Sequence, residues 1–202
     1  MIDNIDLIKP LLNFKEDGDF YMLYVFKRKK DQPEAESSNH QSVRTVKSYC
    51  IESLDHLDKR YEEIKHLCEV FKARAYIHVQ RQNHRDVSLD MIATLAQKIK
   101  DNQHNQKNLF DSVVGSIKTY EKRWIVDIDS KDPDDVFTAK LLINSLEPEG
   151  DKIETTIPTK SGYHLITKRF DSLKFEEILP DIDIQRKNPT LLYFPNSLDI
   201  NS

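Results

Sequence analysis

The sequence predicts a mixed α/β protein of the α+β kind, and three observations lead to this expectation. The chain of 202 residues is 38% hydrophobic and 32% charged, with aromatic residues throughout, and this composition is typical of a globular protein that buries its own core. Short apolar runs of strand length are rich in aromatic and β-branched residues, whereas longer segments repeat apolar residues at helical spacing. In the second half of the chain the two patterns alternate.

The first half begins with two expected strands. Residues 20–28 (FYMLYVFKR) form a run without helical period, which indicates a strand buried on both faces, and a second strand follows over 43–51. Between them, residues 29–42 are polar and contain Pro, Ser and clustered charges. We expect this segment to form an exposed, mobile hairpin loop.

Helices and one further strand complete the first half. Apolar residues recur at helical spacing from Ser53 to about residue 71, and a strand is expected over 73–80. Ser88 is expected to cap the next helix, and a less regular pattern places another helix over 107–119. The apolar residues that the Ser88 helix carries are Leu89, Ile92, Leu95 and Ile99.

The second half shows the clearer pattern. Its helix over 133–146 opens with Asp132-Pro133 and acidic residues, as helix amino termini commonly do. The other expected elements are strands 123–129, 152–158 and 162–168, helix 172–179, and strands 181–185 and 190–194. We place a boundary between two lobes of one compact core near 102–122, which gives an amino-terminal α/β lobe (1–119) and a second lobe (120–202).

Composition also limits the class of function. The two cysteines lack the spacing of a zinc site or a disulfide framework, so we expect a reducing, cytoplasmic setting. The amino terminus is interrupted by charged residues and Pro10, unlike an export signal, and no stretch is apolar enough to span a bilayer, so no membrane association is expected. The net charge of −4 means that any nucleic acid must be held locally or with metal ions that screen phosphate repulsion.

Two aspartates end the strand WIVDID (124–129). Asp127 and Asp129 lie at positions i and i+2, so strand alternation places both carboxylates on one face. Such carboxylates repel each other unless a cation lies between them, and hard oxygen ligands suit Mg²⁺ or Mn²⁺. A solvated turn that caps the following helix is the alternative interpretation, and short motifs of this kind do not exclude it.

The turn TKSGYH (159–164) joins two expected strands. It brings together the ammonium of Lys160, the hydroxyl of Ser161, the flexible backbone of Gly162 and the imidazole of His164, a combination that suits a phosphate chain. A histidine in a strand is more often a hydrogen-bonded structural residue, and Ser-Gly is often merely a turn. A third acidic segment, Asp181-Ile-Asp183, again places two carboxylates on one strand face, where Asp183 can complete the cation site.

The order of these three motifs resembles that of the archaeo-eukaryotic primase superfamily, especially its primase-polymerase branch. The matching segments are WIVDID (124–129), TKSGYHL (159–165) and IDIQ…LLYFPNS (182–197), so the resemblance covers roughly residues 120–197. It implies a primase-polymerase-like core whose carboxy-terminal sheet is RRM-like. It also implies that Asp127, Asp129 and Asp183 bind two divalent cations, Mg²⁺ or Mn²⁺, and carry catalysis.

The same resemblance implies that Ser161 and His164 contact the triphosphate of an incoming nucleotide, whereas Lys160 is assigned there on electrostatic grounds alone. The expected activity is metal-dependent nucleotidyl transfer from nucleoside triphosphates, with a single-stranded DNA template and a helicase or other replication protein as possible partners. Two alternatives remain open. One is a two-metal phosphodiesterase or nuclease that uses the same carboxylates, and the other is a non-catalytic nucleotide- or nucleic-acid-binding subunit with a primase-like fold.

Overall fold

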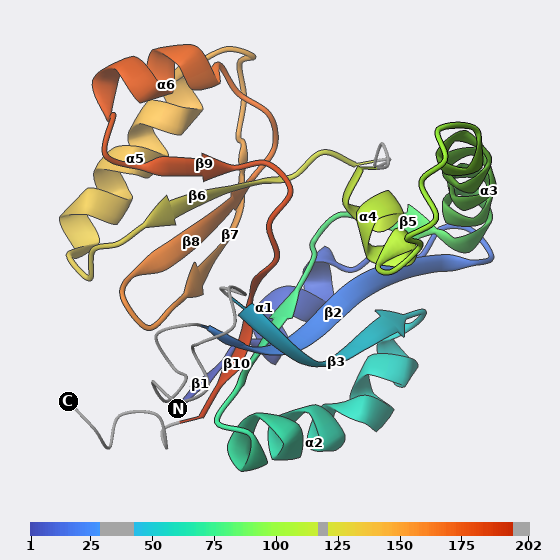
Figure 1. Cartoon of the computed structure of the whole chain (residues 1–202). Helices are drawn as coiled ribbons and strands as arrows, with labels where there is room; N and C mark the ends of the chain where they lie inside the picture. Colours follow the sequence, from blue (N-terminus) through green and yellow to red (C-terminus); the bar gives the residue numbers. More distant parts are fainter. Residues whose placement is uncertain (29–42, 117–120, 196–202) are drawn as a thin grey trace.

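The computed structural model describes residues 1–28, 43–116 and 121–195 (Figure 1). Within these residues the protein is a mixed α+β structure with six α-helices and two antiparallel sheets of six and four strands. The expected hairpin loop over 29–42, the end of the expected helix 107–119 and the last residues of the third motif lie outside the described residues. None of the described helices is long and apolar enough to cross a membrane.

The first sheet has the strand order β1-β10-β4-β2-β3, and a short strand β5 also pairs with β2. Its strands and the helices between them are β1 (Ile2–Asp3), α1 (Ile5–Ile8), the 3-10 turn η1 (Lys9–Leu11), β2 (Asp19–Arg28), β3 (Val43–Ile51), α2 (Leu54–Val70), β4 (Arg74–Ile77), β5 (Gln82–Asn83), α3 (His84–Lys100), α4 (Leu109–Ser116) and β10 (Thr190–Phe194).

The two faces of β2 contact different partners because its side chains alternate. Leu23 and Val25 share a buried cluster with Leu57 and Ile64 of α2, whose amino terminus is capped by Ser53 as expected. On the other face, Phe20 and Met22 pack against residues of α3 and α4. This second face continues along β2 (Figure 1) to Tyr24, which packs at the edge of the same cluster, and then to Phe26 and Arg28.

The second sheet has the connectivity β6-α5-β7-β8-α6-β9 and the strand order β7-β8-β6-β9. Its elements are β6 (Trp124–Ile128), α5 (Pro133–Ser145), β7 (Ile153–Pro158), β8 (Tyr163–Thr167), α6 (Ser172–Ile178) and β9 (Asp183–Gln185). Both helices cover one face, where Val126 and Leu165 pack against Ile143 and Phe175. The predicted succession of elements over 123–185 is therefore confirmed, with small differences at their ends.

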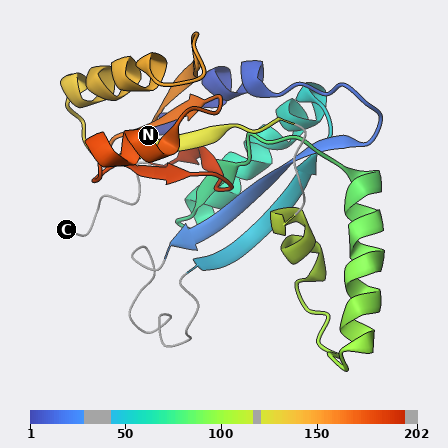
Figure 2. The ribbon, with the colours of Figure 1, turned by 90° about the horizontal axis from the view of Figure 1, so that it is seen from above.

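The other face of the second sheet packs against the first half of the chain. Ile125, Ile157 and Ile166 belong to the same buried cluster as Leu23 and Leu57. Arg123 joins the two halves as well, because one guanidinium nitrogen donates to the carbonyls of Leu11 and Val79, each at 3.0 Å. Figure 2 shows the second sheet with α5 and α6 on one side of the first sheet, and α3 on the other.

Strand 190–194 lies in a different place from the one that the division at residue 119 implies. β10 pairs with β1 and β4, so it belongs to the first sheet although its sequence follows β9. All five of its residues are buried, and such a run needs neighbouring strands on both edges and cover on both faces. The first sheet offers these, whereas β9 has only three residues, the first of them exposed.

The prediction for the amino terminus of α3 was wrong. The helix begins at His84, capped by the Asn83 side chain, which accepts a hydrogen bond from the Arg85 amide, and Ser88 lies inside the helix and donates to the His84 carbonyl. Asn83 is the stronger cap because its side chain is already fixed by a bond to Asp19. Of the four apolar residues named for this helix, Leu95 packs with Val87 and Met91, whereas Leu89, Ile92 and Ile99 are more than half exposed.

The strand expected over 73–80 is also shorter, because β4 ends at Ile77. Beyond Ile77 the chain leaves the strand, and the Gln80 side chain links this segment to the second sheet. Its side-chain amide donates to the carbonyls of Arg123 and Arg186, each at 2.7 Å. These bonds tie the end of β4 to the strands β6 and β9 of the second sheet, where the first and third acidic motifs lie.

Candidate functional site

The central residue of the site is Asp127, which lies near the end of β6. Its backbone pairs with His164 of β8 on one side and with Asp183 of β9 on the other. Residues directly opposite each other in an antiparallel pair point to the same face of the sheet. His164, Asp127 and Asp183 therefore form one row, on the face that α5 and α6 leave uncovered.

The Asp127 carboxylate has a contact on each oxygen. Nε2 of His164 lies 3.4 Å from Oδ1, and the Gln185 amide donates to Oδ2 at 2.9 Å. Burial raises the pKa of Asp127, but the interactions with His164, the positive charge of Arg28 and the Gln185 bond together hold this pKa below its ordinary value. The carboxylate is therefore ionised at neutral pH while 79% of its side chain is removed from solvent, since 21% remains exposed.

Asp129 lies just beyond β6 and is held by the turn between β7 and β8. The Ser161 hydroxyl donates to Oδ1 of Asp129 at 2.8 Å. Gly162 makes this contact possible because its turn lies directly against the end of β6. A Cβ atom at position 162 would meet the Ile128 carbonyl oxygen at 1.9 Å and backbone atoms of Ser130 at 2.7 Å. Close approach, rather than flexibility, is the reason for glycine here.

His164 is buried, and both of its ring nitrogens have partners. Nδ1 lies 2.9 Å from the Thr190 hydroxyl at the start of β10, and Nε2 faces Asp127. The histidine thus links the second sheet to the strand that crosses into the first sheet. The sequence left two interpretations of His164 open, a structural residue or a residue of a binding site. In the structure it is hydrogen-bonded in the interior, and it also lines the cavity described next.

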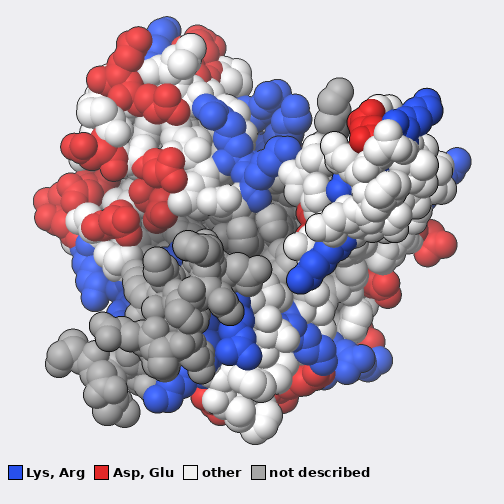
Figure 3. Space-filling model, viewed as in Figure 1, with Lys and Arg blue, Asp and Glu red and all other residues white. Residues whose placement is uncertain are grey.

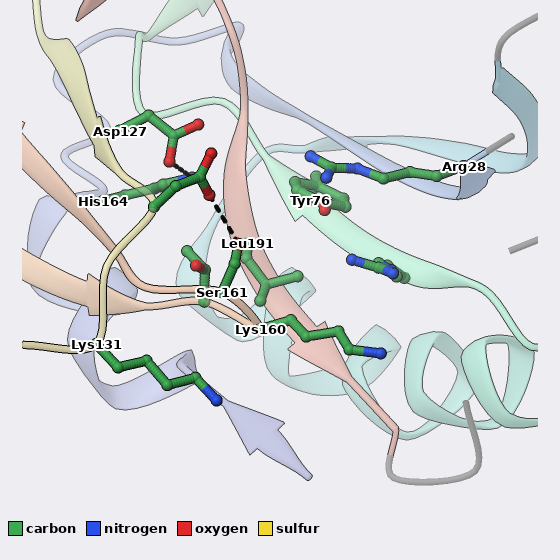
Figure 4. A pocket seen from close by; sticks show the side chains of 11 residues that line it. Arg28, Tyr76, Asp127, Lys131, Lys160, Ser161, His164 and Leu191 are labelled. Atoms are coloured by element: carbon green, nitrogen blue, oxygen red, sulfur yellow. Dashed lines mark hydrogen bonds and ion pairs between the residues drawn. The ribbon is translucent and has the colours of Figure 1, made fainter. Parts of the chain in front are cut away.

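A cavity of about 330 Å³ opens beside Asp127 and Asp129 (Figure 4). The acids and His164 lie along one wall, and the guanidinium of Arg28 extends toward them from the first sheet. Four cationic side chains and two carboxylates line this cavity, an excess of two positive charges before His164 is counted. Its lining residues are Arg28, Arg74, Tyr76, Asp127, Asp129, Lys131, Thr159, Lys160, Ser161, His164 and Leu191.

The structure brings together five of the six predicted site residues in this cavity: Asp127, Asp129, Lys160, Ser161 and His164. Asp183 is the exception. It is exposed at the edge of the sheet, in register with Asp127, but it is not among the residues that line the cavity. Within the described parts of the chain, no group of three or more His, Cys, Asp or Glu side chains is arranged to hold a metal ion.

Sequence reasoning did not assign four charged or aromatic residues of the cavity to the site: Arg28, Arg74, Tyr76 and Lys131. Arg74 and Tyr76 lie two apart in β4, so strand alternation places them on one face, but nothing in a four-residue strand indicates that this face meets Asp127. Two arginines of the cavity make cation–π contacts. The guanidinium carbon of Arg74 lies 4.6 Å from the centroid of the Phe194 ring, and that of Arg28 lies 5.5 Å from the centroid of the Tyr76 ring.

Charge is unevenly distributed around the site. In Figure 3, acidic side chains gather over the second sheet and its helices, whereas Lys and Arg side chains form a group between that sheet and α3. Arg186 contacts the Trp124 ring at 5.3 Å and Arg169 contacts it at 5.9 Å, and Lys187 donates to the Gly115 carbonyl. Trp124 is buried, as expected for a core residue.

No protein-family model matches this chain, and comparison with curated proteins and with solved structures gives no match either.

Proposed function

We propose that the protein is a divalent-metal-dependent nucleotidyltransferase of the primase-polymerase type, acting on nucleoside triphosphates and a single-stranded nucleic-acid template. The observation that carries this proposal is the composition of the cavity: Asp127 and Asp129 face a space whose other walls hold four cations. A triphosphate offers the negative charge that such a cavity lacks. The carboxylates alone would repel it, so the same ligand must arrive with a metal ion.

The arrangement of the second sheet supports the resemblance to the archaeo-eukaryotic primase superfamily. Its β-α-β-β-α-β connectivity and strand order β7-β8-β6-β9 are those of the ferredoxin-like motif, which RRM-like sheets share. The first motif ends the central strand β6, and the second motif forms the neighbouring β7–β8 turn. A fold alone does not define an activity, so the proposal depends on the residues of the cavity.

The residues fit Mg²⁺ or Mn²⁺. Magnesium is commonly bound by one or two carboxylates together with substrate phosphates and water, so Asp127 and Asp129 suffice in the presence of a triphosphate. The lowered pKa of Asp127 keeps it a ligand at neutral pH. Asp183 is the third predicted metal ligand, and it lies in register with Asp127 on the neighbouring strand. When bound, the metal would activate the attacking hydroxyl and stabilise the departing pyrophosphate.

The remaining cavity residues have roles that follow from their charge. Lys160, Arg28 and Arg74 neutralise the phosphate oxygens on which negative charge develops as pyrophosphate leaves. Ser161 fixes the position of the Asp129 carboxylate through its hydrogen bond. His164 orients Asp127 and is itself held by Thr190, so it sets the geometry of the acid as well as facing the phosphates.

One observation favours the alternative of a binding subunit without turnover. The carboxylates of Asp127 and Asp129 already accept contacts from Gln185, His164 and Ser161. Acids satisfied by neighbouring side chains are stable without a cation. In this alternative, calorimetry detects metal-dependent nucleotide binding, whereas no product forms even when a candidate helicase or other partner is added. The nuclease alternative instead requires degradation of labelled DNA by the protein with Mn²⁺ alone.

The decisive experiment is the substitution Asp127→Asn, assayed for nucleotide incorporation on primed and unprimed templates with Mn²⁺. We expect incorporation to be abolished while the melting temperature stays within a few degrees, because asparagine preserves the size of the side chain. Asp181→Asn is the matched control, since Asp181 is an exposed acid of the third acidic segment that does not line the cavity. Unchanged incorporation by the Asp127→Asn protein refutes the catalytic assignment.

A further inference from the structure

A second cavity of about 420 Å³ adjoins the first. The two share Arg28, Tyr76, Asp127 and His164 as lining residues, so they form one continuous cleft. The second cavity extends along the face of the first sheet that carries Tyr24, Phe26 and Tyr76. Its other lining residues are Tyr24, Phe26, Thr45, His78, Gln185, Asn188 and Pro189.

Aromatic side chains form the floor of this second cavity. Tyr24 and Phe26 of β2 and Tyr76 of β4 come from neighbouring strands, and their register places them on one face. Phe26 and Tyr76 stack with their ring planes 5° apart and their centroids at 4.6 Å. Tyr24 contacts His78 edge to face, with centroids 5.8 Å apart. Phe26 and Tyr24 are only partly buried, so part of their surface faces the cavity.

Polar groups stand at the edge of this aromatic floor. Thr45, Gln185 and Asn188 carry hydroxyl and amide groups that both donate and accept hydrogen bonds. Burial lowers the pKa of His78 to about 4, so its imidazole is neutral at physiological pH and can also donate and accept. The second cavity therefore combines a flat apolar surface with neutral hydrogen-bonding groups, whereas the first cavity is charged.

We propose that the second cavity is a nucleobase subsite, in which a base stacks on the Phe26 ring, which Tyr76 supports from behind, and its edge meets Asn188 and Thr45. This inference rests on the proposed function, because the shared residues join the base subsite to the phosphate cavity. Stacking on aromatic rings accepts any base, since every base has a π face. Asn188 and Thr45 determine which base edges are preferred.

The base can belong to the incoming nucleotide or to a nucleic-acid strand, and both present the same chemistry to the rings. The position next to Lys160 and Arg28 favours a base whose own phosphates occupy the first cavity. Arg186 and Lys187 are exposed and directly precede Asn188 in the chain, and they offer a path for the phosphates of a strand. The experiment distinguishes these two sources.

The test compares three ligands with the full chain in calorimetry: a nucleoside triphosphate with Mn²⁺, inorganic triphosphate with Mn²⁺, and a single-stranded oligothymidylate without metal. The variant is Phe26→Leu, which removes the ring but keeps an apolar side chain. Phe137→Leu is the matched control, because Phe137 is an exposed aromatic residue on α5 outside the cleft. Base stacking on an aromatic ring corresponds to a loss of roughly 10-fold in affinity or more when the ring is removed.

We expect Phe26→Leu to weaken binding of the nucleoside triphosphate about 10-fold and to leave inorganic triphosphate within twofold. If only oligothymidylate binding is weakened, the base belongs to a strand, and the subsite still holds. Equal effects on both triphosphates, or no effect on any ligand, overturn the subsite while the phosphate cavity stands. If neither triphosphate binds the wild-type protein, the proposed function fails, and the oligothymidylate arm alone then decides the subsite.

A second variant covers the case in which Phe26→Leu does not fold, as judged by thermal melting. Asn188 is exposed, so Asn188→Ala leaves the core intact. We expect it to change the ratio of affinities between purine and pyrimidine triphosphates by at least threefold without changing the affinity for inorganic triphosphate. An unchanged ratio, together with unchanged oligothymidylate binding, contradicts the assignment of this edge.

Discussion

Two carboxylates with lowered pKa values, one in each sheet, show how differently the two halves of this molecule use an acid. Asp19 at the start of β2 has 1% of its side chain exposed and accepts bonds from Arg81, Asn83 and two backbone amides. Asp127 at the end of β6 is 21% exposed, and its carboxylate contacts two side chains of the described residues, His164 and Gln185. Asp19 is saturated by donors, whereas Asp127 retains coordinating capacity toward a cavity.

This difference separates a structural acid from a candidate ligand-binding acid. A buried carboxylate surrounded by donors on all sides stabilises the loop and strand that supply those donors, and it has no lone pair left for a ligand. A carboxylate at the mouth of a cavity keeps that capacity, and two of the four cations that line this cavity, Arg28 and Arg74, come from the other sheet. The cleft therefore combines groups from both sheets: the carboxylates come from the second sheet, and the arginines and aromatic rings come from the first.

The largest effect is expected from removing the saturated acid. Asp19→Ala deprives the buried Arg81 guanidinium of a partner 2.6 Å away and leaves the Lys15 and Glu16 amides without their acceptor. Breaking one partner of a buried ion pair costs about 3–5 kcal/mol. Urea unfolding should report this loss, and Asp17→Ala, a neighbouring exposed acid, should change stability by less than about 0.5 kcal/mol. Equal free energies of unfolding for the two variants would show that the bonds to Asp19 do not stabilise the fold more than an exposed acid does.

A smaller loss of stability, but a local one, is expected for Gly162→Ala. The new methyl group would collide with backbone atoms of residues 128 and 130, which cannot rotate away as a side chain can. Overpacking of this kind costs about 1–3 kcal/mol. Gly115→Ala is the control, because a Cβ there meets nothing within 4 Å. Thermal melting should separate the two, and metal-dependent nucleotide binding should fall in Gly162→Ala, since Asp129 and Ser161 flank the collision.

The cations of the two sheets offer a direct test of the comparison. Lys160→Ala and Arg28→Ala each remove one positive charge from the cavity, one from the second sheet's turn and one from the first sheet. If both sheets hold the same triphosphate, each variant should weaken its binding by about 10-fold, which corresponds to about 1.4 kcal/mol. Lys168→Ala, an exposed lysine outside the cavity, should have no effect. A loss confined to Lys160→Ala would place the ligand on the second sheet alone.

The parts of this structure that the sequence predicts are those with a local signal. Ser53 and Asp132 cap their helices as expected, and the alternating strands of the second sheet follow from apolar runs of strand length. Asp127 and Asp129 line the same cavity because they lie two residues apart at the end of one strand. Ser161 lies near Asp129 because it belongs to the turn beside that strand end. These features depend on residues that are close in sequence or on the shortest connection between strands.

The unpredicted parts depend on contacts between distant segments. β10 crosses to the first sheet and pairs with β4, the strand that carries the Tyr76 and Arg74 of the cavity. The Asn83 cap was missed because its advantage over Ser88 comes from Asp19, more than sixty residues earlier. Asp183 lies in the expected row, but its strand is an edge, so its side chain is exposed instead of enclosed. No periodicity in a single segment carries this information.

The smallest expected effect is the pH dependence of the stability that the Asp19 carboxylate contributes. It tests whether Asp19 is the structural acid of the two. Burial raises the pKa of Asp19, but the bonds from Asn83, two backbone amides and Arg81 outweigh it, so the folded-state pKa lies below the model-peptide value of 3.8. A depressed pKa means that the stabilisation is complete above the unfolded-state pKa and is lost as the pH falls through the folded-state pKa. Asp19→Asn removes this titration and keeps the shape of the side chain. The difference in unfolding free energy between wild type and Asp19→Asn, measured with urea from pH 7 to pH 3, should therefore be constant down to about pH 5 and then shrink. A difference that grows toward low pH would mean that the protonated acid is the better partner for Arg81, and the distinction drawn between the two carboxylates would then be wrong.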